Sequence, residues 1–389
     1  MFHRPRRAAR ASFGALLAAF ALNAAAVLPA EPVPNVLSLD PDYPDTWVFA
    51  HDINFFSMLD GKVVLLDVAA DTRQYKGAIG AGQFASFIES STRPELYVAE
   101  TFYSRRTRGK RTDTVTIYDK ATLDVVAEIE LPGGKRGQMV THKNMLQLTP
   151  DERFLLVYNF TPAESVTVVD VQRREVLSEI SIAGCSLIYI TGERGFSSLC
   201  SDGAMMTVHF DASGNEVSRQ RLPRFFDIDE DPLFAKAIRI GDTAYFPSFH
   251  GYVQPVGLGG DTPEIRPRWS LLTEDERAAN WRPGGWQIAT GHPDGRLYVL
   301  MHEGGENGTH KNGGSEVWVF DVTSRKRVKR ISLDRWGVSI EVTRGRQPHL
   351  VVTNAEEFSV DVYNAASGRL VRTIGGRLAE TPFLFHAVK

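Results

Sequence analysis

Four ionisable side chains in a glycine-rich segment could hold a metal ion. They are His302, Glu303, Glu306 and His310, in the stretch HEGGENGTHK. Imidazole and carboxylate groups are common ligands of divalent metals, so their spacing is compatible with a metal site. The same stretch also has the composition of a polar loop between two strands, and this second interpretation is favoured. We therefore predict no metal site.

A cluster of cations lies in residues 103–111. Its members are Arg105, Arg106, Arg108, Lys110 and Arg111. The whole chain has 44 Lys and Arg against 47 Asp and Glu, a net charge of −3, so its overall field does not attract polyanions. Nucleic acid is therefore not expected as a partner. The local basic loop can bind an acidic surface or be merely solvated, and the sequence leaves both interpretations open.

Two adjacent aromatic residues, Phe55 and Phe56, follow an apolar stretch. Their rings can fill a hydrophobic core or line a pocket. Position in the chain alone favours the core.

The two cysteines lie on either side of a turn. Cys185 and Cys200 are equally distant from a centre between Gly192 and Glu193, and apolar stretches flank the turn. A hairpin with that centre places the two thiols directly opposite each other, within reach of a disulfide. A pair of free buried thiols is the alternative. Two cysteines alone cannot complete a structural zinc site.

Complete catalytic motifs are missing from the sequence. It has no GxSxG nucleophile elbow, no GxGxxG fingerprint after a strand, no P-loop and no HExxH motif. A self-sufficient enzyme needs a nucleophile with a base, a metal cluster or a phosphate cradle. We therefore predict no catalytic residue in this chain.

A repeated unit indicates the fold that positions these groups. It consists of a strand of β-branched and aromatic residues ending in Asp or a similar residue, a polar turn and a second strand. Successive copies are separated by roughly fifty residues, a period typical of propellers and other repeat folds. The seven copies begin at Lys62, Thr114, Ser165, Met205, Tyr252, Glu316 and Ser359. The copy at Tyr252 is the weakest.

A further strand precedes each copy, and a weaker stretch precedes that strand. The seven preceding strands are expected at residues 46–52, 96–102, 154–160, 196–200, 244–249, 297–302 and 350–354. Seven four-stranded antiparallel units predict an all-β, seven-bladed β-propeller over residues 45–389. A spare strand at residues 383–388 is expected to dock on the first blade and close the ring. An irregular pair of β-sandwiches is the alternative.

Two segments depart from the repeat. Residues 31–44 contain four prolines and are expected to form an extended N-terminal arm. Residues 269–286 (WSLLTEDERAANWRPGGW) form an insert, in which Thr273 and Glu276 have the spacing of a capping box. That spacing predicts a short helix after Thr273.

Residues 1–30 have the pattern of a secretory signal peptide. Four arginines and no acid lie in residues 1–10, an apolar stretch follows at 11–27, and cleavage is expected after Ala30. No second long apolar stretch follows, so we expect an exported protein without a membrane span. An uncleaved anchor helix is the alternative.

Several long motifs resemble the heavy (large) subunit of the quinoprotein amine dehydrogenases, the methylamine and aromatic amine dehydrogenases. They are RGKRTD at 108–113 with the strand TVTIYD behind it, WRPGGW at 281–286, GTHK at 308–311 before EVWVFD, and the pair Cys185 and Cys200. The resemblance spans roughly residues 45–389. GTHK and WSLL are nearer to the aromatic amine branch and WRPGGWQ to the methylamine branch, so the preferred amine is left open.

The resemblance implies a seven-bladed propeller without catalytic groups, in a periplasmic complex of two heavy and two light subunits. The heavy subunit of this family binds no cofactor, and the light subunit carries tryptophan tryptophylquinone and the catalytic base. Primary amines are oxidatively deaminated to aldehyde and ammonia, and electrons pass to a cupredoxin such as amicyanin or azurin.

The resemblance also assigns roles to residues of this chain. A heavy-subunit phenylalanine at the substrate channel matches Phe55, or Phe56 if the alignment slips by one residue. The basic loop becomes a candidate for the subunit interface, with Arg105, Arg106, Arg108, Lys110 and Arg111. A stand-alone propeller binding protein and a lactonase-like propeller enzyme are the alternatives.

Overall fold

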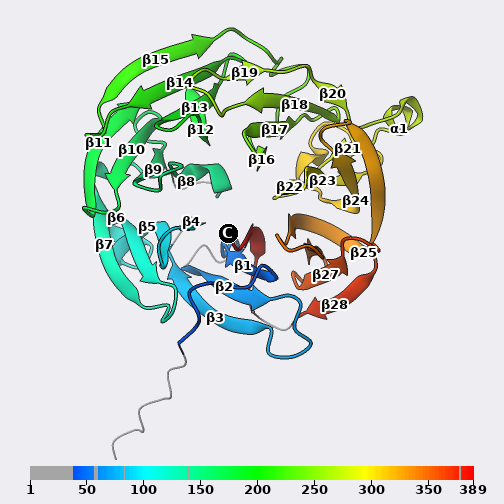
Figure 1. Cartoon of the computed structure of the whole chain (residues 1–389), viewed down its shortest axis with the longest axis horizontal. Helices are drawn as coiled ribbons and strands as arrows, with labels where there is room; N and C mark the ends of the chain where they lie inside the picture. The colour runs from blue at the N-terminus through cyan, green and yellow to red at the C-terminus, as the bar shows by residue number, and fades with distance from the viewer. Residues whose placement is uncertain (1–37, 57–59, 83, 138–140, 376–377) are drawn as a thin grey trace, which may run out of the picture. The chain divides into compact units, whose positions relative to one another are not determined.

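Short strands of β-branched and aromatic residues, separated by polar turns, make up most of the computed structural model (Figure 1). The structure describes residues 38–389 except 57–59, 83, 138–140 and 376–377. The expected signal peptide and most of the expected arm therefore lie outside the described residues. Residues 38–389 form one unit. In the described part of the chain, no helix is long and apolar enough to cross a membrane.

Five sheets of four or five strands surround a central axis, and in each the strands follow one another from the axis outwards (Figure 1). The first sheet holds β29 (Pro382–Ala387), β1 (Trp47–Asp52), β2 (Gly61–Asp67) and β3 (Tyr75–Ala81). The second holds β4 (Ser86–Glu89), β5 (Glu95–Arg105), β6 (Arg108–Asp119) and β7 (Val125–Leu131). The third holds β8 (Leu146–Leu148), β9 (Phe154–Asn159), β10 (Ser165–Asp170) and β11 (Glu175–Ser181).

The two remaining blades follow the same order. The fourth sheet holds β12 (Cys185–Ile190), β13 (Gly195–Cys200), β14 (Met205–Phe210) and β15 (Glu216–Leu222). The fifth holds β16 (Ile238–Ile240), β17 (Thr243–Pro247), β18 (Tyr252–Gly257) and β19 (Glu264–Ile265), with β20 (Trp269–Ser270) also paired to β18. Its outer strands, β19 and β20, have only two residues each, which agrees with the weak fifth copy of the repeat.

A sixth sheet contains eight strands. They are β21 (Arg282–Pro283), β22 (Ala289–His292), β23 (Arg296–His302), β24 (Gly314–Asp321), β25 (Lys326–Val342), β26 (His349–Asn354), β27 (Val360–Asn364) and β28 (Leu370–Ile374). The helical segments are α1 (Glu274–Ala278) and the 3-10 turns η1 (Pro132–Gly134), η2 (Lys143–Met145) and η3 (Thr309–Lys311).

The prediction of seven separate four-stranded blades is wrong. The described strands form five blades and one eight-stranded sheet. The joining element is β25, which is 17 residues long. Its first half pairs with β24, placing Ile331 opposite Val317, and its second half pairs with β26, placing Ile340 opposite Val352. The repeat spacing could not show this, because the connection between the two halves stays extended instead of forming a loop.

The predicted closure of the ring by the C-terminal strand also needs correction. β29 joins the first sheet as an antiparallel partner of β1, with Phe385 opposite Ala50. Of the described strands, β29 forms a ladder with β1 alone. Its link to the eight-stranded sheet is made by single hydrogen bonds, such as the one that the Ser339 hydroxyl donates to the Phe383 carbonyl at 2.7 Å.

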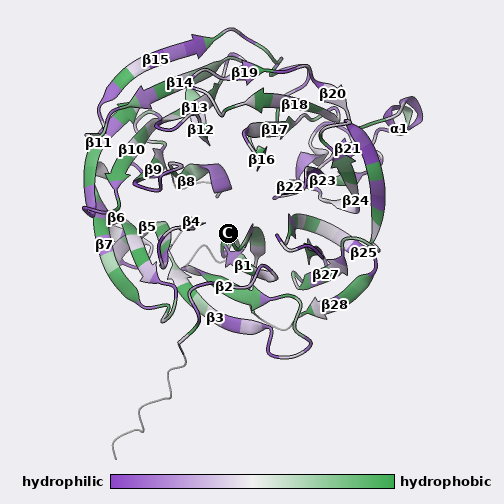
Figure 2. Cartoon of the chain, viewed as in Figure 1, coloured by the Kyte–Doolittle hydropathy of each residue, from purple (hydrophilic) through white to green (hydrophobic). Residues whose placement is uncertain are grey.

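Hydrophobic side chains fill the spaces between neighbouring sheets. Phe49 of the first sheet packs on Phe87 of the second with ring centroids 4.8 Å apart, and Trp318 is fully buried in the eight-stranded sheet. The outermost strands face water, and Figure 2 shows β15 as largely hydrophilic. Burial on both faces of the central strands explains why the sequence signal is strongest there.

The local predictions agree well with the strands. The seven strands expected before each copy of the repeat correspond to β1, β5, β9, β13, β17, β23 and β26. The capping box is also confirmed: the Glu276 amide donates to the Thr273 hydroxyl at 3.3 Å, and the Thr273 amide donates to the Glu276 carboxylate at 2.9 Å. Arg327 of β25 pairs with the same carboxylate at 2.7 Å, so the helix is attached to the ring.

Candidate functional site

The turn after β1 is held by one buried carboxylate. Asp52 is 4% exposed and accepts hydrogen bonds from the backbone amides of Asn54 (3.0 Å), Thr381 (2.9 Å) and Glu380 (2.7 Å). Asn54 takes a left-handed conformation, with φ of 49°. The Phe55 amide donates to the Thr381 hydroxyl at 2.9 Å. The turn is thus attached to the segment that leads into β29.

Five aromatic rings meet at this turn and form what we call the aromatic cluster: Phe55, Phe56, Trp286, Phe358 and Phe383. Phe55 lies 5.5 Å from Phe56 and 5.4 Å from Trp286 between ring centroids, and Phe383 lies 5.3 Å from both Trp286 and Phe358. Phe383 is 6% exposed, whereas Phe55 is 39% and Phe56 is 61% exposed. The two predicted phenylalanines are therefore the outer members of the cluster, and the position-based preference for a core role is wrong.

Other exposed aromatic residues lie at the same end of the sheets. β1, β5 and β9 are the second strands of their sheets, and equivalent strands of an antiparallel repeat run in the same direction. Phe102 is near the end of β5 and Phe160 follows β9; their exposed fractions are 40% and 43%. Trp336 is 38% exposed, and its backbone carbonyl accepts a hydrogen bond from the Ala355 amide, just after β26. We call this end of the ring the aromatic face.

The basic loop is the tip of the β5–β6 hairpin, whose strands of 11 and 12 residues extend beyond the other strands of their sheet. Four cations on it are exposed: Arg105, Arg106, Arg108 and Lys110. Arg111 has a different environment, because it pairs with the buried Asp113 at 2.8 Å and donates to the Arg136 carbonyl at 2.6 Å. The hairpin therefore presents four solvated cations beside the aromatic face. The fifth cation, Arg111, stabilises the part of the hairpin nearest the sheet through its pair with Asp113.

A small cavity of about 40 Å³ lies beneath Trp286. His142, Lys236 and Leu384 contribute to its lining. The Lys236 ammonium donates to the Gly285 carbonyl at 3.1 Å, and burial, with the nearby Lys311, lowers its pKa to about 8. Burial lowers the pKa of His142 to about 4, so that imidazole is neutral at neutral pH.

The glycine-rich segment with His302 and His310 does not form a metal centre: among the described residues, no group of three or more His, Cys, Asp or Glu side chains could hold an ion. His302 ends β23 and is 2% exposed, with its ring 6.4 Å from that of Trp336. His310 lies in η3 and its ring is 6.5 Å from that of Phe249. Burial lowers the pKa of both imidazoles.

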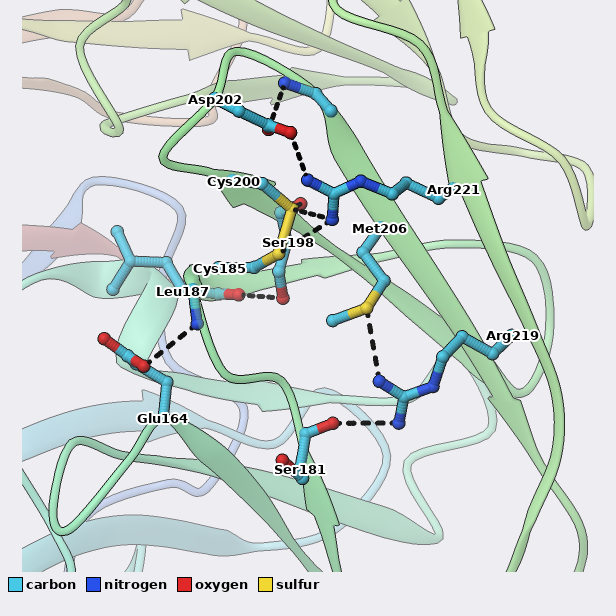
Figure 3. Close-up of a disulfide and its surroundings, with 12 residues drawn as sticks. Glu164, Ser181, Cys185, Leu187, Ser198, Cys200, Asp202, Met206, Arg219 and Arg221 are labelled. Carbon is cyan, nitrogen blue, oxygen red and sulfur yellow. Dashed lines mark hydrogen bonds and ion pairs between the residues drawn. A yellow bond between two sulfur atoms is a disulfide. The ribbon is translucent and has the colours of Figure 1, made fainter.

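Cys185 and Cys200 form a disulfide, as the hairpin geometry predicts (Figure 3). They are direct partners in the β12–β13 ladder, although a bulge follows, at which Leu187 has φ of 63°. The Arg221 guanidinium lies 3.3 Å from the Cys200 sulfur and is linked to Asp202. The disulfide is far along the chain from the aromatic cluster and serves the fourth sheet.

Sequence reasoning missed three members of the aromatic cluster, Trp286, Phe358 and Phe383. They are contributed by the segment before β22, the β26–β27 turn and β29, which only the closed arrangement of sheets brings together. Trp286 and Phe383 do stand in segments that depart from the repeat, and that departure was the available signal.

Solved structures of low sequence identity share this fold. One is described as dihydro-heme d1 dehydrogenase NirN in complex with DHE; it is 17% identical, covers 92% of this chain and 68% of its own, and has a TM-score of 0.55. A functionally unknown protein from Desulfotomaculum acetoxidans is 14% identical with a TM-score of 0.56, covering 85% of this chain and 95% of its own. These likenesses, with the radial sheets, define the class: an all-β propeller.

The sequence comparisons identify the family. The family model for the methylamine dehydrogenase heavy chain matches residues 46–387. The methylamine dehydrogenase heavy chain of Methylobacillus flagellatus is 27% identical, covering 93% of this chain and 92% of the relative, and that of Paracoccus versutus is 31% identical, covering 71% and 65%. The chain belongs to the methylamine dehydrogenase heavy chain family.

Proposed function

We propose that this chain is the non-catalytic heavy subunit of an exported amine dehydrogenase that converts primary amines to aldehyde and ammonia. The observation that carries this proposal is the family match over residues 46–387. In this proposal residues 1–30 are a signal peptide removed on export to the periplasm, and residues 31–44 form an arm ahead of the propeller.

The aromatic face and the basic loop at the tip of the β5–β6 hairpin, which we call the basic hairpin, are together the proposed surface for the light subunit. Exposed aromatic residues are enriched at protein interfaces, where they are buried by the partner, and arginine is enriched with them. The two features lie at the same end of the sheets as Phe55. An acidic rim on the light subunit would complement Arg105, Arg106 and Arg108.

The light subunit is proposed to carry the tryptophan tryptophylquinone, which supplies the redox chemistry and passes electrons to a cupredoxin. The aromatic cluster contains only apolar ring surface, apart from the indole nitrogen of Trp286. Its contribution is to exclude water from the substrate channel and to contact the apolar part of the amine. Phe55 is the ring best placed for this, because it is supported by Trp286 and still 39% exposed.

Reconstitution tests the proposal as a whole. The full chain is co-expressed with a methylamine dehydrogenase light subunit, and the purified complex is assayed for a quinone absorbance and for amine-dependent dye reduction. We expect both signals in the complex and neither in this chain alone. Amine-dependent dye reduction by this chain alone would contradict the division of roles.

Substitution of Phe55 tests the channel. In the assembled complex, Phe55→Ala should change the ratio of kcat/KM for a short and a bulky amine by more than about threefold, since apolar pocket contacts discriminate at this level. Phe160→Ala is the matched control, because Phe160 is equally exposed on the aromatic face but is outside the aromatic cluster. An unchanged ratio in Phe55→Ala rejects the assignment.

A further inference from the structure

A second cavity, of about 260 Å³, lies on the axis of the ring. Its walls come from the inner strands β4, β8, β16, β22 and β29 and from the inner half of β25, which surround the centre in Figure 1. One end of this cavity shares Lys143 with the small cavity beneath Trp286. Its other end is lined by Arg344, which follows β25, and Lys389, which follows β29. This end of the ring is opposite the aromatic face.

The inner wall of this axial cavity holds a fully satisfied carboxylate. Glu341 is 1% exposed and accepts hydrogen bonds from Lys143, from the Thr290 hydroxyl and, at 3.1 Å, from the Gln287 amide. A second lining carboxylate, Glu89, pairs with Lys120 at 2.7 Å. Both lining carboxylates are therefore already neutralised by lysines.

The mouth of the cavity carries two arginines that take no part in the lysine–glutamate pairs just described. Arg344 is exposed and donates to the Gly291 carbonyl at 3.2 Å. Against the effect of burial, its charge and that of Lys143 lower the pKa of Glu341, but Arg344 makes no ion pair at close contact with the described side chains.

Arg239 is also exposed; it donates to the Ile190 carbonyl at 2.6 Å and to the Gly241 carbonyl at 3.0 Å, and faces the exposed Asp242 carboxylate at 3.6 Å. The mouth thus offers two guanidinium groups, of which Arg344 is the less engaged.

One buried polar atom of the cavity lacks a partner. Nε2 of His386 is inaccessible to solvent and has no hydrogen-bond partner among the described groups. The ring is fixed edge-on against Phe87, with centroids 5.0 Å apart. A ligand in the cavity does not reach this inaccessible atom, and burial keeps the imidazole neutral by lowering its pKa well below the ordinary value.

We propose that the axial cavity binds a small oxyanion, a carboxylate or a phosphate, recognised by Arg344 and Arg239 at its mouth. Guanidinium groups bind such oxygens through two parallel charge-assisted hydrogen bonds. The volume suits a small metabolite and excludes a polymer. This site is at the end of the ring opposite the aromatic face and does not depend on the proposed amine dehydrogenase function.

Calorimetric titration tests the site. Inorganic phosphate and acetate are titrated separately into the purified full chain, with ionic strength held constant by NaCl because screening would otherwise change the signal. We expect saturable binding of at least one probe, weakened at least fivefold by Arg344→Gln or Arg239→Gln. Arg369→Gln is the matched control, since Arg369 is exposed in the turn between β27 and β28 and does not line the cavity.

The two probes distinguish the sources. Tighter phosphate binding identifies a phosphate ligand, and tighter acetate binding identifies a carboxylate. The proposal is overturned by a lack of saturable heat with both probes up to about 20 mM, a range in which specific binding is still measurable. It is also overturned if Arg344→Gln and Arg239→Gln both bind as the unchanged protein does, or if Arg369→Gln weakens binding as much as they do.

Discussion

At the scale of single residues, buried carboxylates hold together segments that are distant in the sequence. Glu152, 5% exposed in the turn before β9, accepts hydrogen bonds from Ser91 and Thr92, with oxygen distances of 2.6 and 2.8 Å, and from the Ser90 hydroxyl. Burial raises the pKa of Glu152, but these hydrogen bonds outweigh it and lower the pKa to about 2. The second and third sheets are joined at this point.

The lowered pKa predicts a pH-dependent stability. Because the folded pKa is below the ordinary value of 4.5, the Glu152 carboxylate stabilises the fold above about pH 4.5, and this contribution is lost as the pH falls towards about 2. Glu152→Gln should therefore lower the free energy of unfolding by about 3 kcal/mol at pH 7. Urea denaturation at pH 7 and pH 3 measures the difference, which should shrink at pH 3.

The control for this prediction is Glu175→Gln, which removes an exposed carboxylate paired with Arg173 at 3.5 Å. An exposed pair contributes little, so we expect a change below about 0.5 kcal/mol at either pH. A Glu152→Gln effect of equal size at both pH values would show that the carboxylate charge is not responsible.

At the scale of elements, the β12–β13 hairpin shows what a local pattern can predict. The alternation of residues and the turn specified which positions face each other, and Cys185 and Cys200 are indeed partners. The bulge after Ser186 was not predictable, because it depends on how the hairpin packs between the third and fifth sheets. It shifts the register by one residue towards the turn without disturbing the disulfide end.

Removal of this disulfide should destabilise the ring without unfolding it. The double variant Cys185→Ser, Cys200→Ser frees a loop with a sequence separation of 15, and the chain-entropy model gives a cost of about 3 kcal/mol. Denaturant unfolding measures the loss. The unchanged protein in reductant should show the same loss, and the variant should be insensitive to reductant; a variant as stable as the oxidised protein would refute a stabilising role.

The β5–β6 hairpin gives a prediction about assembly. Arg105→Gln, Arg106→Gln and Arg108→Gln in combination should weaken association with the light subunit at least tenfold at low salt, and less at high salt, because exposed charges are screened. Surface-immobilised light subunit and a salt series measure this. Arg73, Arg325 and Arg369, in hairpins at the opposite end of the blades, provide the matched triple control. Equal loss in both triple variants would exclude a local contact.

At the scale of the whole molecule, the ring has two chemically different ends. The aromatic face carries exposed rings and the basic hairpin, and the opposite end carries the arginine-lined mouth of the axial cavity. Glu341 lies between them and ties η2, β22 and β25 together through Lys143 and Thr290. The axis of the ring is thus a polar, hydrogen-bonded core inside layers of hydrophobic sheets.

Much of this molecule could be predicted from local patterns, but the aromatic cluster could not. The strand positions, the capping box at Thr273 and the disulfide each depend on residues that are close together in the sequence. The aromatic cluster joins Phe55 to Trp286, Phe358 and Phe383, which the sequence separates by hundreds of residues. The continuity of β25 was likewise hidden, because no residue type marks a connection that stays extended.

The junction between the first sheet and the eight-stranded sheet is where the stability of the ring should be most sensitive. Phe385 of β29 is fully buried against Val48 of β1 and against Val351 and Val362 of β26 and β27. Phe385→Ala should lower the free energy of unfolding by about 3–5 kcal/mol, through lost transfer energy and the cavity left behind. Phe385→Leu should lose less than about 1.5 kcal/mol, because it keeps most of the volume.

The matched control is Val371→Ala in the outer strand β28, where the side chain is 45% exposed and the expected change is below about 0.5 kcal/mol. Because β29 forms its ladder with β1 alone, its side chains and its single hydrogen bonds attach the first sheet to the eight-stranded sheet. Loss of Phe385 should therefore also increase hydrogen exchange at the amides of β1 and β26 together. Faster exchange confined to β1 would mean that the two sheets are held together by other contacts.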